Sequence, residues 1–157
     1  MKVEFVNPFV TAARDVLKQE VGSEVERGKV YLHRSPFTSH QVTAMIAVTG
    51  SVQGLVLYGM SEATALAMVE KMLGQPCREF DELAQSGIAE LANVITGQAG
   101  IQLSRSGYAV QISPPALIIG HNTMISTLDL TRLVIPLETD YGVIETQVAL
   151  KETPAVK

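Results

Sequence analysis

One segment, from Asp81 to Gly107, constrains the fold more than any other. Polar or small residues recur in it at intervals of four, three, four and three, and they are Ser86, Glu90, Asn93, Gly97 and Gly100. At about 100° per residue, these positions fall in a band roughly 80° wide along one side of an α-helix. The opposite side needs a core to pack on, because its residues are Leu83, Ala84, Ile88, Leu91, Val94, Ile95, Ala99 and Leu103. We therefore expect Glu90 and Asn93 to face away from the core.

The two glycines of this stripe are unusual inside a helix. Each costs roughly 1 kcal/mol relative to alanine in a helix interior, so some advantage should offset the cost. Two explanations remain open from the sequence. Gly97 and Gly100 permit close packing within the domain, or they permit the backbone of a partner to approach the stripe beside Glu90 and Asn93.

Length and composition predict a single domain over residues 1–157 without an internal linker. The net charge of −4 and the absence of a basic run argue against nucleic acid or an anionic membrane as partner. No apolar run approaches the roughly 20 residues that a membrane-spanning helix needs. The single cysteine, Cys77, has no partner for an intramolecular disulfide, and the sequence does not open with a secretion signal. We expect a cytoplasmic protein.

Apolar periodicity predicts three helices, over Phe5–Glu20, Glu62–Leu73 and 81–107. Asn7 and Pro8 suit the cap and first residue of the first helix, although a start one turn earlier is also allowed. Ser61 suits the cap of the second helix, and Gly74 suits its end.

Alternating apolar residues predict a set of strands. The expected strands are Lys29–Arg34, Gln41–Thr49, Val52–Gly59, Ala109–Ser113, Ala116–Ile119, Thr123–Leu137 and Val143–Leu150, with residues 151–157 as a loose tail. The fold class is α+β, with amphipathic helices packed on a largely antiparallel β-sheet. Each half reads as a helix followed by extended segments, with the Glu62–Leu73 helix between the halves. At the level of pattern alone, this order indicates an internal pseudo-repeat.

Most familiar chemical motifs are absent. His33, His40 and His121 stand far apart without metal-ligand spacing, so we expect no metal site. There is no nucleophile elbow, no phosphate-binding loop and no dinucleotide fingerprint. The Gly-x-x-Gly string that starts at Gly97 resembles a clamp for RNA, but it lies inside a helical pattern without basic neighbours.

The spacing Ser86-x-x-x-Glu90-x-x-Asn93, with Pro115 after twenty-one intervening residues, resembles the motif of the CheC/CheX family of chemotaxis phosphatases. A single motif in a chain of this size is more similar to the CheX branch. Flanking segments fit the same family, and they are Asn7-Pro8-Phe9, Thr49-Gly50-Ser51 before Gly54, Leu73-Gly74 and Ile112-Ser113-Pro114-Pro115. The resemblance covers nearly the whole chain.

The resemblance implies hydrolysis of the aspartyl phosphate of a CheY-type response regulator. In that family the motif helix docks at the phosphorylation site, so Asn93 would orient the attacking water and Glu90 would anchor the regulator through its active-site lysine. Phosphoryl transfer through a loose transition state depends on positioning more than on a strong base, which suits an amide. Glu90 as general base is less favoured, because an exposed carboxylate is a weak base at neutral pH.

The resemblance assigns smaller roles to the other motif residues. Ser86 is expected to support Glu90, Pro115 to fix the path of the chain beside the helix, and Gly97 and Gly100 to belong to the partner-docking face. The protein would need no cofactor of its own, since the regulator would supply Mg²⁺. Relatives form homodimers, and the long hairpin strands of this chain would pair edge to edge across a two-fold axis.

The CheC branch carries a second copy of the motif on its first helix. Glu4-x-x-Asn7 has the last spacing of that motif, but no Ser or Asp precedes Glu4 by four residues in this sequence. We therefore expect one site per chain.

Two other classes of function remain. The fold also resembles part of flagellar switch proteins, so a non-catalytic interaction module is the first alternative. A small-ligand binding domain is the second. The presence of both Glu90 and Asn93 favours the phosphatase.

Overall fold

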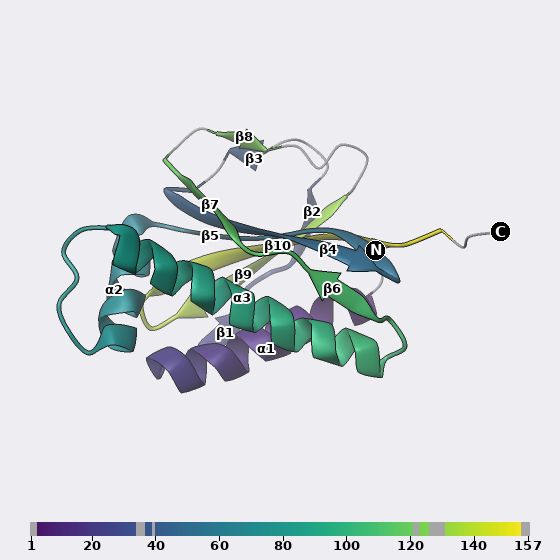
Figure 1. Ribbon diagram of the computed structural model, residues 1–157, viewed down its shortest axis with the longest axis horizontal. Helices are drawn as coiled ribbons and strands as arrows, with labels where there is room; N and C mark the ends of the chain where they lie inside the picture. Colours follow the sequence, from purple (N-terminus) through teal and green to yellow (C-terminus); the bar gives the residue numbers. More distant parts are fainter. Residues whose placement is uncertain (1–2, 34–36, 39, 121–122, 126–130, 155–157) are drawn as a thin grey trace.

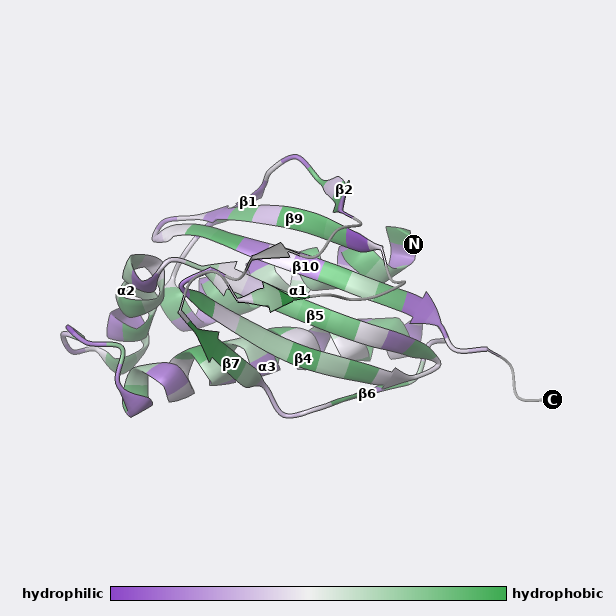
Figure 2. Ribbon diagram, turned by 90° about the horizontal axis from the view of Figure 1, so that it is seen from above, coloured by the Kyte–Doolittle hydropathy of each residue, from purple (hydrophilic) through white to green (hydrophobic). Residues whose placement is uncertain are grey.

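The computed structural model describes residues 3–33, 37–38, 40–120, 123–125 and 131–154. Its helices are α1 (Val3–Val21), α2 (Glu62–Leu73) and α3 (Glu82–Arg105). All of them lie on one face of a sheet, with α1 and α3 side by side (Figure 1). Figure 2 looks onto the sheet, with the helices behind it. The predicted α+β architecture is confirmed.

The main sheet has eight strands, and all of its pairs are antiparallel. They are β1 (Val25–Arg27), β2 (Tyr31–His33), β4 (Val42–Gly50), β5 (Val52–Met60), β6 (Val110–Ile112), β7 (Ala116–Ile119), β9 (Arg132–Thr139) and β10 (Gly142–Glu152). Their order is β1-β9-β10-β5-β4-β6, with β2 also on β9 and β7 also on β4. The short strands β3 (Phe37–Thr38) and β8 (Met124–Ile125) pair separately.

The topology contains the internal pseudo-repeat that the sequence pattern indicates. Two hairpins, β4–β5 and β9–β10, meet at the centre of the sheet, where β5 pairs with β10 and Val56 lies opposite Val148. The strands that follow α1 extend the sheet beyond β9, while those that follow α3 extend it beyond β4. Each half thus completes the sheet edge of the other half, which makes the chain one interlocked unit.

The core lies between the sheet and the helices. Its largest fully buried apolar side chains include Phe5, Phe9 and Leu17 of α1, Ile46 of β4, Met68 of α2 and Ile88 and Leu103 of α3. Fully burying each such side chain contributes about 1.5–3 kcal/mol. The face of α3 that packs here fixes which side of the helix remains outside.

Helix α2 has the predicted bounds, because its signals are local. The Ser61 hydroxyl accepts the Thr64 N–H at 3.1 Å, and Gly74 ends the helix at φ 67°. Of the two starts that the sequence allowed for α1, the earlier one is confirmed: α1 begins at Val3 and contains Pro8, so Asn7 is not its cap. Phe5 and Val6 are buried, and burying them requires the helix to start before the proline.

Two strand predictions are also wrong. The segment Thr123–Leu137 is not one strand, because β8 pairs with β3 and β9 begins only at Arg132, with residues 126–130 outside the described residues. Residues 151–152 of the predicted tail belong to β10, where Glu152 pairs with Val52. Thr153 N–H donates to Ser51 O at 3.0 Å, so the hairpin turn holds the chain there. Residues 155–157 of the tail lie outside the described residues.

The edge-to-edge pairing expected of the long hairpins is contradicted by the sheet order. Strands β5 and β10 pair with each other, β4 pairs with β6 and β7, and β9 pairs with β1 and β2. The backbone groups of the long strands therefore form their hydrogen bonds within the chain.

No helix among the described residues is long and apolar enough to cross a membrane.

Candidate functional site

The site rests on α3, whose start is well defined. The Asp81 carboxylate accepts the Ala84 N–H at 3.0 Å, and Asp81 O accepts the Gln85 N–H at 2.9 Å. This cap satisfies N–H groups that a helix end would otherwise leave unpaired. The helix ends before Ser106 and Gly107, so one continuous helix presents all the motif residues except Pro115.

The polar stripe faces outward, as predicted. Ser86 and Glu90 are exposed, and Asn93, Gly97 and Gly100 are half-buried. The opposite side packs on the core through Ala84, Ile88, Leu91, Ile95, Ala99 and Leu103. Glu90 and Asn93 are separated by three residues, so they are neighbours on the same helix surface. One partner can therefore contact both side chains at once.

Leu83 corrects the predicted core face, because 53% of it is exposed. Ile101 is 54% exposed and follows Leu83 by eighteen residues, about five helical turns, so both lie on the same side of α3. The sequence pattern placed Leu83 inside only because it is apolar. The exposed stripe thus has an apolar residue at each end and Glu90 and Asn93 between them.

A buried hydrogen bond fixes α3 to the sheet beneath Asn93. The Tyr58 hydroxyl of β5 lies 2.8 Å from Thr96 Oγ1, and Thr96 in turn donates to Ala92 O at 2.8 Å. Because the Thr96 proton is used, Tyr58 is the donor to Thr96. Burial raises the pKa of Tyr58, which keeps its proton in place. The helical turn that carries Asn93 therefore has one fixed position on the sheet.

Pro115 lies in the connection between β6 and β7, which runs back along α3 (Figure 1). Ile112 before it borders a depression with Gly97, and Leu117 after it borders one with Ser86. At Pro115 the connection therefore runs beside the middle of the polar stripe of α3. The same connection is tied to β4, since Ser113 N–H donates to Ala47 O at 2.9 Å and Ala47 N–H donates to Ser113 Oγ at 2.9 Å.

The surroundings of the two stripe glycines differ. A methyl group at Gly97 would meet no atom within 4 Å outside its own helical backbone. A methyl group at Gly100 would contact Val110 Cγ2 at 3.4 Å, an ordinary van der Waals distance. Close packing within the domain therefore does not explain Gly97.

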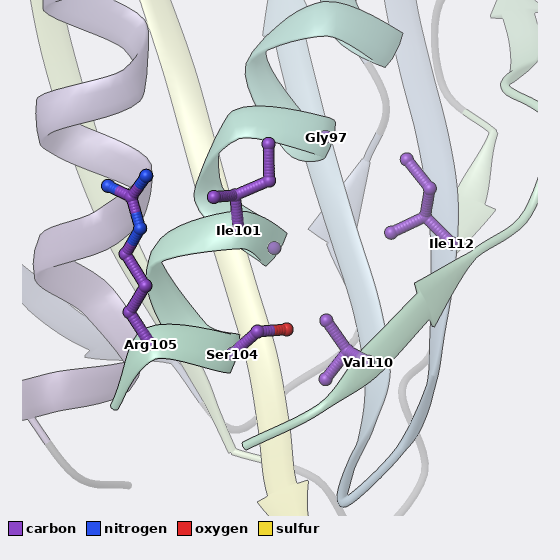
Figure 3. Close-up of a pocket in the computed structure, with 7 residues that line it drawn as sticks. Gly97, Ile101, Ser104, Arg105, Val110 and Ile112 are labelled. Carbon is purple, nitrogen blue, oxygen red and sulfur yellow. The ribbon is translucent and has the colours of Figure 1, made fainter. Parts of the chain in front are cut away.

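Gly97 and Gly100 border a groove of about 400 Å³ between α3 and β6, which is also lined by Ile101, Ser104, Arg105, Val110 and Ile112 (Figure 3). Figure 3 shows Ser104 of α3 pointing toward Val110 of β6, Ile101 extending along α3 toward Gly97, and Arg105 on the side next to α1. The groove begins one helical turn beyond Asn93 and continues the exposed stripe.

Among the described residues, no group of three or more His, Cys, Asp or Glu side chains is placed to hold a metal ion. His33 lies 3.0 Å from the Arg132 guanidinium through Nδ1, and His40 lies 3.5 Å from Glu145. His33 therefore joins β2 to β9, and His40, which precedes β4, contacts β10. His121 lies outside the described residues.

The start of α1 presents Glu4 and Asn7, which are both exposed. The Tyr108 hydroxyl donates to Glu4 at 3.0 Å, so this carboxylate is held by the segment that follows α3. The working expectation of one site per chain, on α3, is retained.

The sequence alone did not identify Tyr58, Thr96 or Ile101 as part of this region. Tyr58 and Thr96 are thirty-eight residues apart and belong to different elements, so no local spacing connects them. Ile101 was not singled out either, although helical spacing places it about 20° from Glu90, at the border of the polar stripe.

Comparison with known proteins agrees with this geometry. Residues 42–138 match the family model described as chemotaxis phosphatase CheX. The chain is 30% identical over 128 residues to the CheY-P phosphatase CheX of Thermotoga maritima, covering 81% of this chain and 83% of that protein.

Solved structures extend the match to nearly the whole chain. The chemotaxis protein CheX from Desulfovibrio desulfuricans is 27% identical with a TM-score of 0.85, and the match covers 96% of this chain and 100% of that one. A CheX–CheY–BeF₃–Mg²⁺ complex from Borrelia burgdorferi matches with 29% identity and a TM-score of 0.82, covering 96% and 100% of the two chains. Family model, sequence identity and fold together show that this chain belongs to the CheX family of chemotaxis phosphatases.

Proposed function

We propose that this protein is a phosphatase that hydrolyses the aspartyl phosphate of a CheY-type response regulator in chemotaxis or related two-component signalling. One observation carries the proposal: Glu90 and Asn93 stand together on the outer side of α3, in a chain of the CheX family. The Thermotoga relative is named a CheY-P phosphatase, and the Borrelia relative is seen in a complex with CheY.

Asn93 is proposed to orient the attacking water. Its amide oxygen would accept a hydrogen bond from the water, so that the water oxygen faces the phosphorus in line with the bond to the regulator's aspartate. Attack breaks that phosphorus–oxygen bond, the aspartate carboxylate leaves, and inorganic phosphate is the second product. An acyl phosphate is already activated, so positioning supplies much of what the reaction needs. The half-buried setting of Asn93 above a fixed helical turn supports this role.

Glu90 is proposed to anchor the regulator by an ion pair with the lysine of its active site. The side chain of Glu90 is exposed, so it is available to a partner. A charge-assisted hydrogen bond formed away from water is roughly twice as strong as a neutral one. Docking would bury this ion pair and would at the same time bring Asn93 to the phosphorylated aspartate of the regulator.

Ser86 and Pro115 are proposed to support these two residues. Ser86 is exposed one turn before Glu90 and would hydrogen-bond to it or to a backbone carbonyl. Pro115 would hold the connection between β6 and β7 close to α3, since its ring fixes φ and removes one backbone donor.

The regulator is proposed to bring the Mg²⁺ that the reaction uses. The Borrelia complex, which contains CheY, BeF₃ and Mg²⁺ together, supports this division of labour. A magnesium ion at the phosphoryl group would neutralise charge on its oxygens. This chain would then contribute the amide, the carboxylate and the docking surface.

A homodimer in the cytoplasm completes the proposal. Leu32 of β2 is 58% exposed and Met124 of β8 is 75% exposed, and the proposal places exposed apolar side chains such as these at the contact with a second copy. Light scattering would give twice 16.9 kDa for a dimer. A mass of 16.9 kDa at micromolar concentration would contradict the dimer.

The test is a phosphate-decay assay with the CheY-type regulators of the same cell. Each regulator is phosphorylated, and the release of inorganic phosphate is followed with and without this protein. We expect at least one regulator to lose its phosphate faster with the protein present. Tight binding of a regulator without faster decay would instead favour the non-catalytic interaction module.

A further inference from the structure

The glycine at position 97 is not required by the fold. Its φ is not among the positive values that favour glycine, and a methyl group there would meet no atom within 4 Å outside its own helical backbone. Glycine in a helix interior lowers stability relative to alanine. The sequence thus keeps an unfavourable residue that neither the backbone nor internal packing explains.

Gly87 of the same helix shows the contrasting case. A methyl group at Gly87 would lie 3.3 Å from Val69 Cγ2 of α2, so close helix packing accounts for that glycine. Gly87 and Gly97 therefore serve as an internal comparison. The first lies against a neighbouring helix, and the second lies against open space.

That open space adjoins the polar stripe. Gly97 follows Asn93 by four residues, about one helical turn, and it lines the groove between α3 and β6. The walls are mostly apolar, with Ile101 and Ser104 on one side and Ile112 on the other (Figure 3). Ile101 is 54% exposed beside this groove.

We infer that Gly97 determines how closely the response regulator approaches Asn93, and that the groove receives an apolar side chain of the regulator beside its phosphorylation site. The inference rests on the proposed function. An asparagine side chain has only one methylene between its Cα and its amide, so the amide reaches a phosphorylated aspartate only if the regulator's surface comes very close to α3. A missing Cβ one turn away permits that approach.

The groove favours an apolar side chain because its walls offer few polar groups. Burying apolar surface on both partners stabilises a complex by about 25 cal/mol per Å² before the costs of association. A regulator that seats one side chain between Ile101 and Ile112 would bury the exposed Ile101. Glu90 would then supply charge recognition, and the groove would supply apolar contact.

The test compares Gly97→Leu and Gly97→Ala with the wild type in three measurements. The first is the midpoint of chemical unfolding, which we expect to stay at or above the wild-type value. The second is the Kd for a regulator loaded with beryllofluoride, which we expect to rise about tenfold or more in Gly97→Leu and less in Gly97→Ala. The third is hydrolysis, where KM should rise with Kd while kcat at saturating regulator changes little in Gly97→Ala.

Two control variants, which should not raise Kd, separate the effect of added bulk from an effect on docking, and a third variant tests the groove itself. Glu26→Leu adds the same apolar side chain at an exposed position of β1, at the edge of the sheet opposite β6, and should leave Kd and KM unchanged. Gly87→Ala should shift stability without the increase in Kd. Ile101→Ala removes one wall of the groove and should raise Kd several-fold.

The outcomes separate the two claims. If the wild type accelerates phosphate loss from no regulator, the proposed function fails. If the wild type is active and folded Gly97→Leu matches it in both Kd and KM, the role of Gly97 is refuted and the phosphatase function stands. A loss of unfolding stability in Gly97→Ala would also refute it, because Gly97 would then serve the fold.

Discussion

The Tyr58 hydroxyl lies 2.8 Å from Thr96 Oγ1, and both side chains are buried between sheet and helix. This contact joins β5, at the centre of the sheet, to the helical turn that presents Asn93. A buried hydroxyl without a hydrogen-bond partner would lower the stability of the fold. The pair therefore favours one position of α3 on the sheet. The hydrogen bond between Tyr58 and Thr96 thus helps to fix the position of the polar stripe on the outer side of α3.

Replacing Tyr58 by phenylalanine should lower the free energy of unfolding by about 1 to 2 kcal/mol, because Thr96 loses its buried donor. Thr96→Val should cost a similar amount, since it leaves the Tyr58 hydroxyl unpaired. The double variant should cost less than the sum of the two, because neither polar group remains. Chemical unfolding of the four proteins measures the coupling, and strictly additive losses would contradict the hydrogen bond.

Replacing Asp81 by alanine should destabilise the protein by about 1 kcal/mol. The Asp81 carboxylate accepts the Ala84 N–H at 3.0 Å, and its charge is favourable at the positive end of the helix. Asp81→Asn keeps the acceptor and should recover most of the loss. Thermal unfolding checks both variants, and equal stability of Asp81→Ala and the wild type would show that the cap contributes nothing.

His40 and Glu145 should make stability depend on pH. The hydrogen bond to Glu145 raises the pKa of His40 from its ordinary 6.5, against the lowering effect of partial burial. The hydrogen bond from His40 lowers the pKa of Glu145 from 4.5, against the raising effect of partial burial. The contribution of His40 is thus complete below 6.5 and is lost as pH rises through its raised pKa. That of Glu145 is present above 4.5 and is lost as pH falls.

The stability difference between the wild type and Glu145→Gln should therefore be larger at about pH 5.5 than at about pH 8.5. Chemical unfolding at the two pH values measures it. His40→Gln, which removes the titrating partner, should flatten the dependence. A difference that stays constant across this range would contradict the ion pair, which spans 3.5 Å between the two side chains.

Removing Mg²⁺ with a chelator should abolish the accelerated loss of regulator phosphate. The unfolding midpoint of this chain alone should stay unchanged, since the ion is proposed to belong to the regulator. Full acceleration after chelation would contradict the proposed division of labour. A shifted midpoint of the isolated chain would point to a metal site on this protein.

Local signals in the sequence predicted much of the fold. Helix α2 was predicted to the residue because Ser61 and Gly74 act on their immediate neighbours. The start of α1 was left between two positions, because burial of Phe5 against distant segments decides in favour of the earlier one. Strands as short as β1 and β3 carry too few residues for an alternating pattern, and they form only because longer strands lie beside them.

In the candidate site too, local spacing was predictable from the sequence, whereas features that depend on distant contacts were not. The spacing of Glu90 and Asn93 determines that they share a helix face, and the structure places that face outside. The sequence misplaced Leu83, because periodicity identifies apolar residues but not whether a neighbour covers them. It also left Gly97 open between two explanations. Only the surrounding atoms decide that the glycine does not serve internal packing.

The central claim is that Asn93 acts in hydrolysis while Glu90 acts in docking. The most direct measurement is the rate of phosphate loss from the cognate regulator at increasing concentrations of wild type, Asn93→Ala and Glu90→Ala. We predict that Asn93→Ala lowers kcat by about a hundredfold or more while it binds the beryllofluoride-loaded regulator with nearly wild-type Kd. Glu90→Ala should instead raise Kd and KM. Folded Asn93→Ala that keeps the wild-type kcat would contradict the account.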